Sequence, residues 1–98
     1  MKYTFVASAR AELREAVDFY NRRQSRLGEE FFEEFEETIS RILQRPASWK
    51  RLAENIYRCR LERFPYFLIY ERKPDRIRIV AVAHFRRRPN YWRSRLTP

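Results

Sequence analysis

The sequence contains almost no glycine and almost no cysteine. Gly28 is the only glycine among 98 residues, so no glycine-rich loop can surround a phosphate, and nucleotide hydrolysis of that kind is excluded. Cys59 is the only cysteine, which rules out an internal disulfide and is typical of a reducing compartment. We expect Cys59 to be a small core residue. A catalytic thiol is the disfavoured alternative, because the chain has no histidine besides His84.

Long apolar runs are absent as well. No segment approaches the roughly 18 to 20 apolar residues of a membrane span, and the N-terminal stretch MKYTFVASARAELREA becomes charged too early for a signal peptide. We therefore expect a cytoplasmic protein with no membrane association. The length leaves room for a single domain, residues 1–98, and the 44% hydrophobic content is enough to build its core. We expect no cofactor and no metal site.

Charge, in contrast, is abundant and unevenly placed. The formal net charge is +9, but residues 1–40 carry six basic and nine acidic side chains, whereas residues 41–98 carry sixteen basic and four acidic ones. Nineteen of the 22 basic residues are arginine, whose planar fork binds phosphates and carboxylates bidentately. A generic basic surface is the alternative, but this segregation favours an anionic partner for the second half.

The first half of the sequence has the pattern of a short strand followed by two helices. Residues 2–6 alternate and are β-prone, and Ser8 is a plausible N-cap for a helix over residues 9–23. Aromatic and aliphatic residues recur at helical spacing over residues 29–45, so a second helix is predicted to end before Pro46.

The second half changes to the period of strands. Residues 46–55 have the composition of a connection, and residues 57–61 then alternate between apolar and charged side chains. Further strands are predicted over residues 66–71 and 77–85, joined into a hairpin by the turn KPDR at 73–76. The sequence therefore predicts an α+β fold of order β-α-α-β-β-β, with a helical hairpin on one face of a small, curved, mainly antiparallel sheet.

Side-chain parity suggests where the charge gathers. Arg58 and Arg60 point to the same side of their strand. The last strand and its continuation carry a second set of one parity, interrupted by two valines: Arg76, Arg78, His84 and Arg86. If these faces coincide, the end of the sheet and the arginine-rich tail form a basic concavity for an anionic ligand.

Two segments carry a resemblance to a known family. YRCRLERFPYFLIYER and, after a turn, IRIVAVAHFRRRPNYW resemble the RelE/ParE superfamily of bacterial toxins, the toxic halves of type II toxin–antitoxin pairs, also known as plasmid stabilisation proteins. The helical segments AELREAVDFYN and LGEEFFEEFEETISRIL match as well, so the resemblance covers nearly the whole chain. It implies the same fold and a neutralising antitoxin that wraps the helices and sheet in a hetero-oligomer.

The superfamily has two branches with different targets. RelE-like members cut messenger RNA on the ribosome, and ParE-like members inhibit DNA gyrase. Metal-free RNA cleavage needs groups that activate the 2′-hydroxyl and protonate the leaving oxygen, besides cations for the phosphate. Arginine supplies only the cation. The lysines, Lys2, Lys50 and Lys73, are not expected on the arginine-bearing face.

The chain departs from the RelE-like pattern at specific positions. Arg58 and Arg60 match its two basic residues on the second strand in charge, with arginine in place of lysine. Phe67 occupies the place of an arginine on the third strand. The RelE-like pattern has another arginine near the end of the last strand. It aligns with Phe85 of this chain if the alignment has no gap, and with Arg86 if a gap is introduced.

These departures favour a ParE-like, non-enzymatic toxin that poisons DNA gyrase. A RelE-like, metal-independent endoribonuclease acting on the ribosome and messenger RNA is the alternative, and Tyr91 matches the C-terminal tyrosine that such enzymes use. Its candidate catalytic residues are Arg58, Arg60, His84, Arg86 and Tyr91. A plain nucleic-acid-binding module is a third possibility, but the helices are the acidic part of the chain, which argues against major-groove reading.

Several candidate side chains have two interpretations. His84 is a general base or, more often at a strand end, a structural hydrogen-bonding residue. Tyr91 and Trp92 either stack on bases or anchor the antitoxin, or they fold back and cover the open edge of the sheet. The residues expected to bind the target or the antitoxin are Arg58, Arg60, Arg78, Arg86, Arg87, Arg88, Tyr91 and Trp92.

Overall fold

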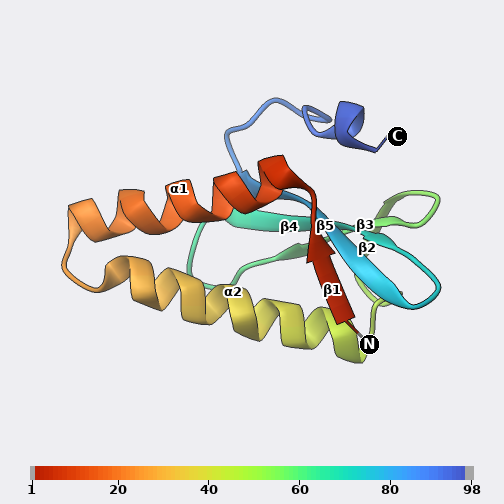
Figure 1. Cartoon of the computed structure of the whole chain (residues 1–98), viewed down its shortest axis with the longest axis horizontal. Coiled ribbons are helices and arrows are strands. Elements are labelled where there is room, and N and C mark those ends of the chain that lie inside the picture. The colour runs from red at the N-terminus through yellow and green to blue at the C-terminus, as the bar shows by residue number, and fades with distance from the viewer. Residues whose placement is uncertain (1, 97–98) are drawn as a thin grey trace.

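Two helices lie side by side against one face of a five-stranded sheet in the computed structural model, which describes residues 2–96 (Figure 1). The elements are β1 (Lys2–Phe5), α1 (Ala7–Arg23), α2 (Leu27–Gln44), β2 (Lys50–Ala53), β3 (Ile56–Arg60), β4 (Tyr66–Arg72), β5 (Arg76–His84) and the 3₁₀ turn η1 (Arg93–Arg95). The strand order is β1-β5-β4-β3-β2. β1 runs parallel to β5, and the other neighbours are antiparallel. The predicted α+β fold is confirmed, and neither helix within residues 2–96 is long and apolar enough to cross a membrane.

The predicted order was one strand short. Residues 50–53, expected to belong to a connection, form β2 and pair antiparallel with β3. The strand reverses into β3 at Asn55, whose φ of 62° lies in the left-handed region that asparagine tolerates. β2 has only four residues, with Lys50 and Arg51 exposed, so it shows no apolar alternation that a sequence pattern could detect.

Both helix starts differ from the prediction for tertiary reasons. Ser8 does not cap α1. The helix begins at Ala7 because β1 leads directly into it, with the Val6 amide donating to the carbonyl of Ile79 at 3.0 Å. Gly28 lies inside α2 rather than before it. A Cβ at Gly28 would be 2.3 Å from the carbonyl oxygen of Val17, so the only glycine permits the close approach of the two helices.

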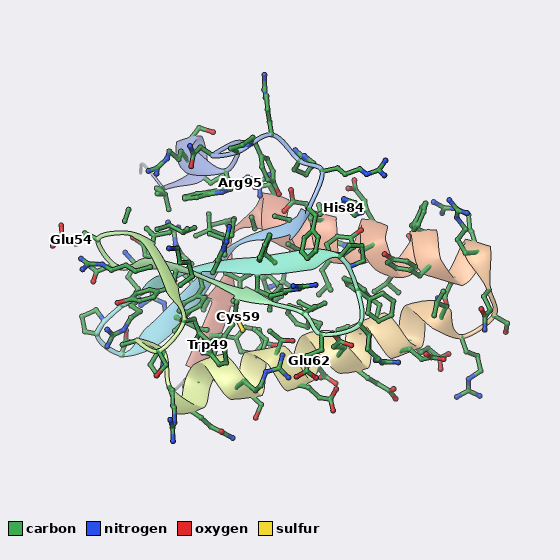
Figure 2. All side chains as sticks on the ribbon, turned by 180° about the vertical axis from the view of Figure 1, so that it is seen from behind. Trp49, Glu54, Cys59, Glu62, His84 and Arg95 are labelled. Atoms are coloured by element: carbon green, nitrogen blue, oxygen red, sulfur yellow. The ribbon has the colours of Figure 1, made fainter. Side chains whose placement is uncertain are left out.

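Apolar side chains cover both faces of the sheet. The larger cluster lies between the sheet and the helices and includes Phe31, Phe35, Leu68, Ile77 and Ile79. Cys59 belongs to this cluster, between β3 and α2 (Figure 2), and burial raises the pKa of its thiol. The expectation that it is a core residue is confirmed.

The other face of the sheet, called the second face below, has its own apolar cluster. It consists of Ile56, Ile69, Val80, Ala81, Ala83 and Trp92. Trp92 comes from residues 85–96, called the C-terminal segment below, which crosses back over the sheet near the start of α1 (Figure 1).

A β-bulge divides β5 into two halves of opposite parity. Ile69 of β4 pairs with Ala81, and the next residue, Tyr70, pairs with Ile79, so Val80 is an extra residue on β5. Before the bulge, Ile79 faces the helices; after it, Val82 does. The predicted common face of Arg76, Arg78, His84 and Arg86 is therefore wrong, because the bulge separates the first two from His84.

Candidate functional site

Arginine side chains on the second face lie over aromatic rings. The guanidinium of Arg58 is 4.3 Å from the ring centroid of Phe67, and that of Arg60 is 5.2 Å from the ring centroid of Phe85. The two phenylalanine rings contact each other, with centroids 4.7 Å apart. Within residues 2–96, neither Arg58 nor Arg60 makes an ion pair, so their N–H groups remain available to an anion.

A cavity of about 200 Å³ lies between this aromatic pair and the C-terminal segment. Apolar side chains from both sides line it, together with the polar residues Arg58, His84, Arg87, Arg88 and Asn90. Its walls are Leu52, Phe67, Ile69, Ala83, Phe85, Pro89, Tyr91 and Trp92. The cavity is large enough for one apolar or aromatic group, and the arginines favour a partner with negative charge beside it.

Lys50 also belongs to this surface, which corrects the expectation that the lysines lie elsewhere. Lys50 pairs directly with Arg58 across β2 and β3, and directly opposed residues point to the same face. Together with Arg58, Arg60 and Phe67 it lines a shallow hollow. The correction follows from the missed strand β2, because a residue in a loop has no fixed face.

Arg78 lies on the second face but is paired within the protein. Its NH2 group is 3.1 Å from Oε1 of Glu71, and its Nε donates to the same oxygen. Arg78 thus has an acidic partner, which Lys73 shares at 3.6 Å, whereas Arg58 and Arg60 have none within residues 2–96.

His84 lies where the chain leaves the sheet, on the side of α1 (Figure 2). Its Nδ1 accepts a hydrogen bond from the Arg86 amide at 3.0 Å, and its ring packs edge-on against Tyr66 with centroids 5.1 Å apart. This hydrogen bond engages Nδ1 within the protein.

Tyr91 and Trp92 fold back onto the protein. Trp92 is buried in the cluster of the second face. The Tyr91 hydroxyl donates to Oε2 of Glu12 at 2.8 Å, and burial followed by this hydrogen bond raises the pKa of Tyr91. The phenol is therefore held neutral and engaged, which is unfavourable for proton transfer to a substrate.

Glu12, which sequence analysis did not single out, connects the C-terminal segment to the helical layer. Its carboxylate accepts hydrogen bonds from NH1 and NH2 of Arg95, each at 2.9 Å, and from the amide of Val82 at 3.0 Å. NH1 of Arg87 lies 3.6 Å from it. The sequence did contain a signal for Glu12, because this carboxylate lies on the apolar side of α1. It follows Ala9 by three residues and precedes Ala16 by four, and both alanines are buried.

This cluster also closes the open edge of β5. β1 pairs with β5 only as far as Ile79. Beyond that point Glu12 accepts the amide of Val82, and NH1 of Arg95 donates to the carbonyl of Val80 at 2.9 Å. The C-terminal segment thus covers the open edge with Arg95 and the second face with Trp92.

The three consecutive arginines of the tail have different environments. Arg87 lies against the ring of Tyr91, 3.8 Å from its centroid, and near Glu12. Arg86 and Arg88 are exposed and form no ion pair within the described part of the chain. The structure thus places Arg58, His84, Arg87, Arg88, Tyr91 and Trp92 around the cavity and Arg60 over Phe85 beside it. Arg78 lies on the same face but is paired with Glu71.

Comparisons with known proteins agree with this architecture. A family model described as "ParE toxin of type II toxin-antitoxin system, parDE" matches residues 3–89. A solved structure, "Chromosomal ParDE TA system from P. aeruginosa", contains a chain that is 18% identical, with a TM-score of 0.73. The superposition covers 86% of this chain and 95% of that one, and at this identity it shows the fold alone. No curated protein matches the sequence.

Proposed function

The chain belongs to the ParE toxin family of type II toxin–antitoxin systems, and we propose that it inhibits growth by poisoning DNA gyrase in the cytoplasm until a cognate antitoxin neutralises it. The observation that supports this proposal is the contact between Phe67 and Phe85 on the second face. In a RelE-like ribonuclease both positions, aligned without a gap, would carry arginine. An aromatic pair cannot neutralise the charge of the phosphate that is cleaved.

Two of the candidate acid–base groups for RNA cleavage are engaged within the protein. The Tyr91 hydroxyl is bound to Glu12, and Nδ1 of His84 is occupied by the Arg86 amide. Arg58 and Arg60 remain permanently charged and cannot accept a proton. The surface is suited to holding an anionic partner, and binding alone is enough for a toxin that blocks its target.

The RelE-like endoribonuclease remains the second candidate because of Lys50. This lysine lies opposite Arg58 on the second face, where a ribonuclease of that kind carries basic residues. Arg86, exposed at the end of β5, is the alternative source of the arginine that Phe85 lacks. The third possibility, a plain nucleic-acid-binding module, has no comparable observation in its favour.

Two assays on one preparation distinguish these functions. We expect the purified chain to inhibit supercoiling by DNA gyrase and to leave messenger RNA on translating ribosomes intact. Arg58→Ala should weaken the inhibition, whereas Arg14→Ala, which removes an exposed arginine of α1, serves as the matched control. If the chain instead cleaves messenger RNA, Lys50→Ala abolishes the cleavage and gyrase is unaffected, the function is that of the RelE-like ribonuclease.

The antitoxin is proposed to cover the same basic surface. Arg58, Arg60, Arg86 and Arg88 lack internal acidic partners within residues 2–96, so an acidic stretch of the antitoxin can supply them. An antitoxin bound there would block access of the target to Arg58 and the cavity beside it. The antitoxin would then neutralise the toxin by competing with the target for the same surface.

A further inference from the structure

The polar contacts of the C-terminal segment converge on a single carboxylate of α1. Arg87, Tyr91 and Arg95 all contact Glu12. Arg95 binds in the bidentate arrangement, NH1 to Oε1 and NH2 to Oε2, in which arginine and carboxylate match each other in geometry. Figure 2 shows Arg95 on the segment beside the start of α1.

The pair lies in a place where water screens it little. The side chains of Glu12 and Arg95 are 10% and 17% exposed. Removing one partner of a buried, hydrogen-bonded ion pair leaves an uncompensated buried charge. It therefore costs far more free energy than removing one partner of an exposed pair. A single change at Glu12 therefore withdraws three contacts of the segment at once.

The segment also carries part of the cavity wall. Arg88, Pro89 and Trp92 line the cavity from the segment, and Arg58 lines it from the sheet. The cavity exists only while the segment lies closed against the second face. Glu12 does not line this cavity. It contacts Arg87 and Tyr91 of the segment, which do, and its contact with β5 is the Val82 amide, which an amide side chain at position 12 can still accept.

We propose that Glu12 is a positioning residue, which holds the C-terminal segment closed and thereby sets Arg88 on the cavity wall that it shares with Arg58. The closed segment is the arrangement that engages the target. That second statement rests on the proposed function, whereas the closure by Glu12 does not.

The test compares Glu12→Gln with Glu15→Gln, a matched change at an exposed position of the same helix. The amide introduced by Glu12→Gln keeps an oxygen that can accept the Val82 amide, so the edge of β5 remains paired while the charge that binds Arg95 is lost. Trypsin should cleave after Arg93 and Arg95 about 10²-fold faster in Glu12→Gln, as expected for the loss of one partner of a buried ion pair. Wild type and Glu15→Gln should resist equally. Arg95→Met changes only the segment and also removes the trypsin site after residue 95. It should accelerate cleavage after Arg93 to the same extent, which keeps the test valid if Glu12→Gln folds poorly.

Three further measurements separate positioning from a merely structural role. Cleavage at the C-terminal end of α1, after Arg22 and Arg23, should not accelerate, because the opening is local. In a double-mutant cycle, Glu12→Gln combined with Arg95→Met should open the segment no more than either change alone. Gyrase inhibition should fall at least about tenfold in Glu12→Gln, in line with a population of closed segment reduced to a minority.

Each arm has an outcome that overturns the proposal. Unchanged cleavage after Arg93 in both variants would show that Glu12 does not hold the segment. An open segment with undiminished gyrase inhibition would show that the closed arrangement is not needed for the target. A wild-type chain with no effect on gyrase would overturn the proposed function and the role of the closed segment in it, while the protease arm would still decide closure.

Discussion

The guanidinium of Arg58 lies 4.3 Å from the ring centroid of Phe67, on the face of the sheet that the helices leave uncovered. Phe67 in turn contacts Phe85, over which Arg60 lies. The rings thus hold the guanidinium groups of two arginines of β3 in place without neutralising them. A charged surface that is pre-ordered in this way loses less conformational entropy when it binds a partner.

Replacing Phe67 should loosen Arg58 with little effect on the fold. We expect Phe67→Leu to keep the apolar contact of the second face while losing the cation–π attraction, which is worth about 0.5–1 kcal/mol at such sites. A double-mutant cycle of Phe67→Leu and Arg58→Ala, with the free energy of unfolding of each protein measured in urea, gives this coupling. Gyrase inhibition should weaken in Phe67→Leu. Coupling indistinguishable from zero would mean that the ring does not hold the arginine.

Gly28→Ala should destabilise the protein even though alanine is the better helix former. Its Cβ would meet the Val17 carbonyl oxygen at 2.3 Å and the Asn21 side chain at 2.6 Å, so the helices would have to separate. Overpacking of this kind costs about 1–3 kcal/mol, more than the gain of about 1 kcal/mol in helix propensity. Urea unfolding measures the net change, with Ser40→Ala on the exposed side of α2 as the control. A more stable Gly28→Ala variant would show that the helices are not in close contact here.

Alkaline pH should destabilise the protein in part through Tyr66. Burial, followed by the neighbouring Tyr20, raises the pKa of Tyr66 from 10.0 to about 12. The folded state thus keeps a proton that the unfolded state releases above its ordinary pKa. This contribution to stability is complete below about pH 10 and is lost as the pH rises to about 12, by less than about 1.4 kcal/mol per pH unit because the site is partly exposed.

The comparison that isolates this effect is Tyr66→Phe against Tyr3→Phe, since Tyr3 is exposed. Unfolding free energies between pH 9 and 12 should fall less steeply for Tyr66→Phe than for wild type and Tyr3→Phe. Parallel curves for all three proteins would assign the alkaline loss to other groups.

Association with the antitoxin should depend strongly on salt. Electrostatic steering by exposed, unpaired arginines can raise association rates well above about 10⁶ M⁻¹s⁻¹ at low ionic strength. We expect Arg58→Ala, Arg60→Ala and Arg88→Ala each to slow association and reduce its salt dependence. Arg78→Ala should change the association rate less, because that side chain already has Glu71 as an acidic partner within the protein. Rates that hardly change between low and high salt would contradict an acidic contact on this surface.

The sequence by itself determined the elements whose signals are local. The sequence predicts α1 and α2 from the helical spacing of their apolar residues, and it predicts the turn between β4 and β5 from its residue types. Both signals lie in a short stretch of chain, because backbone preference and apolar periodicity are local properties. The placement of Arg58 and Arg60 on one face follows in the same way from alternation along β3.

Tertiary structure decided what depends on partners distant in sequence. β2 exists because β3 offers an edge, and its formation moved Lys50 onto the second face. The extra residue Val80 depends on the pairing register with β4, and it turned His84 toward the helices against the parity of the sequence. The contact of Glu12 with Arg95 joins residues 83 positions apart, and neither residue alone shows which of 22 basic and 13 acidic side chains will meet. Coulomb attraction depends on the distance between charges and not on their spacing in the sequence. The packing of α1 against β5 therefore selects this pair, and the pair in turn positions the C-terminal segment.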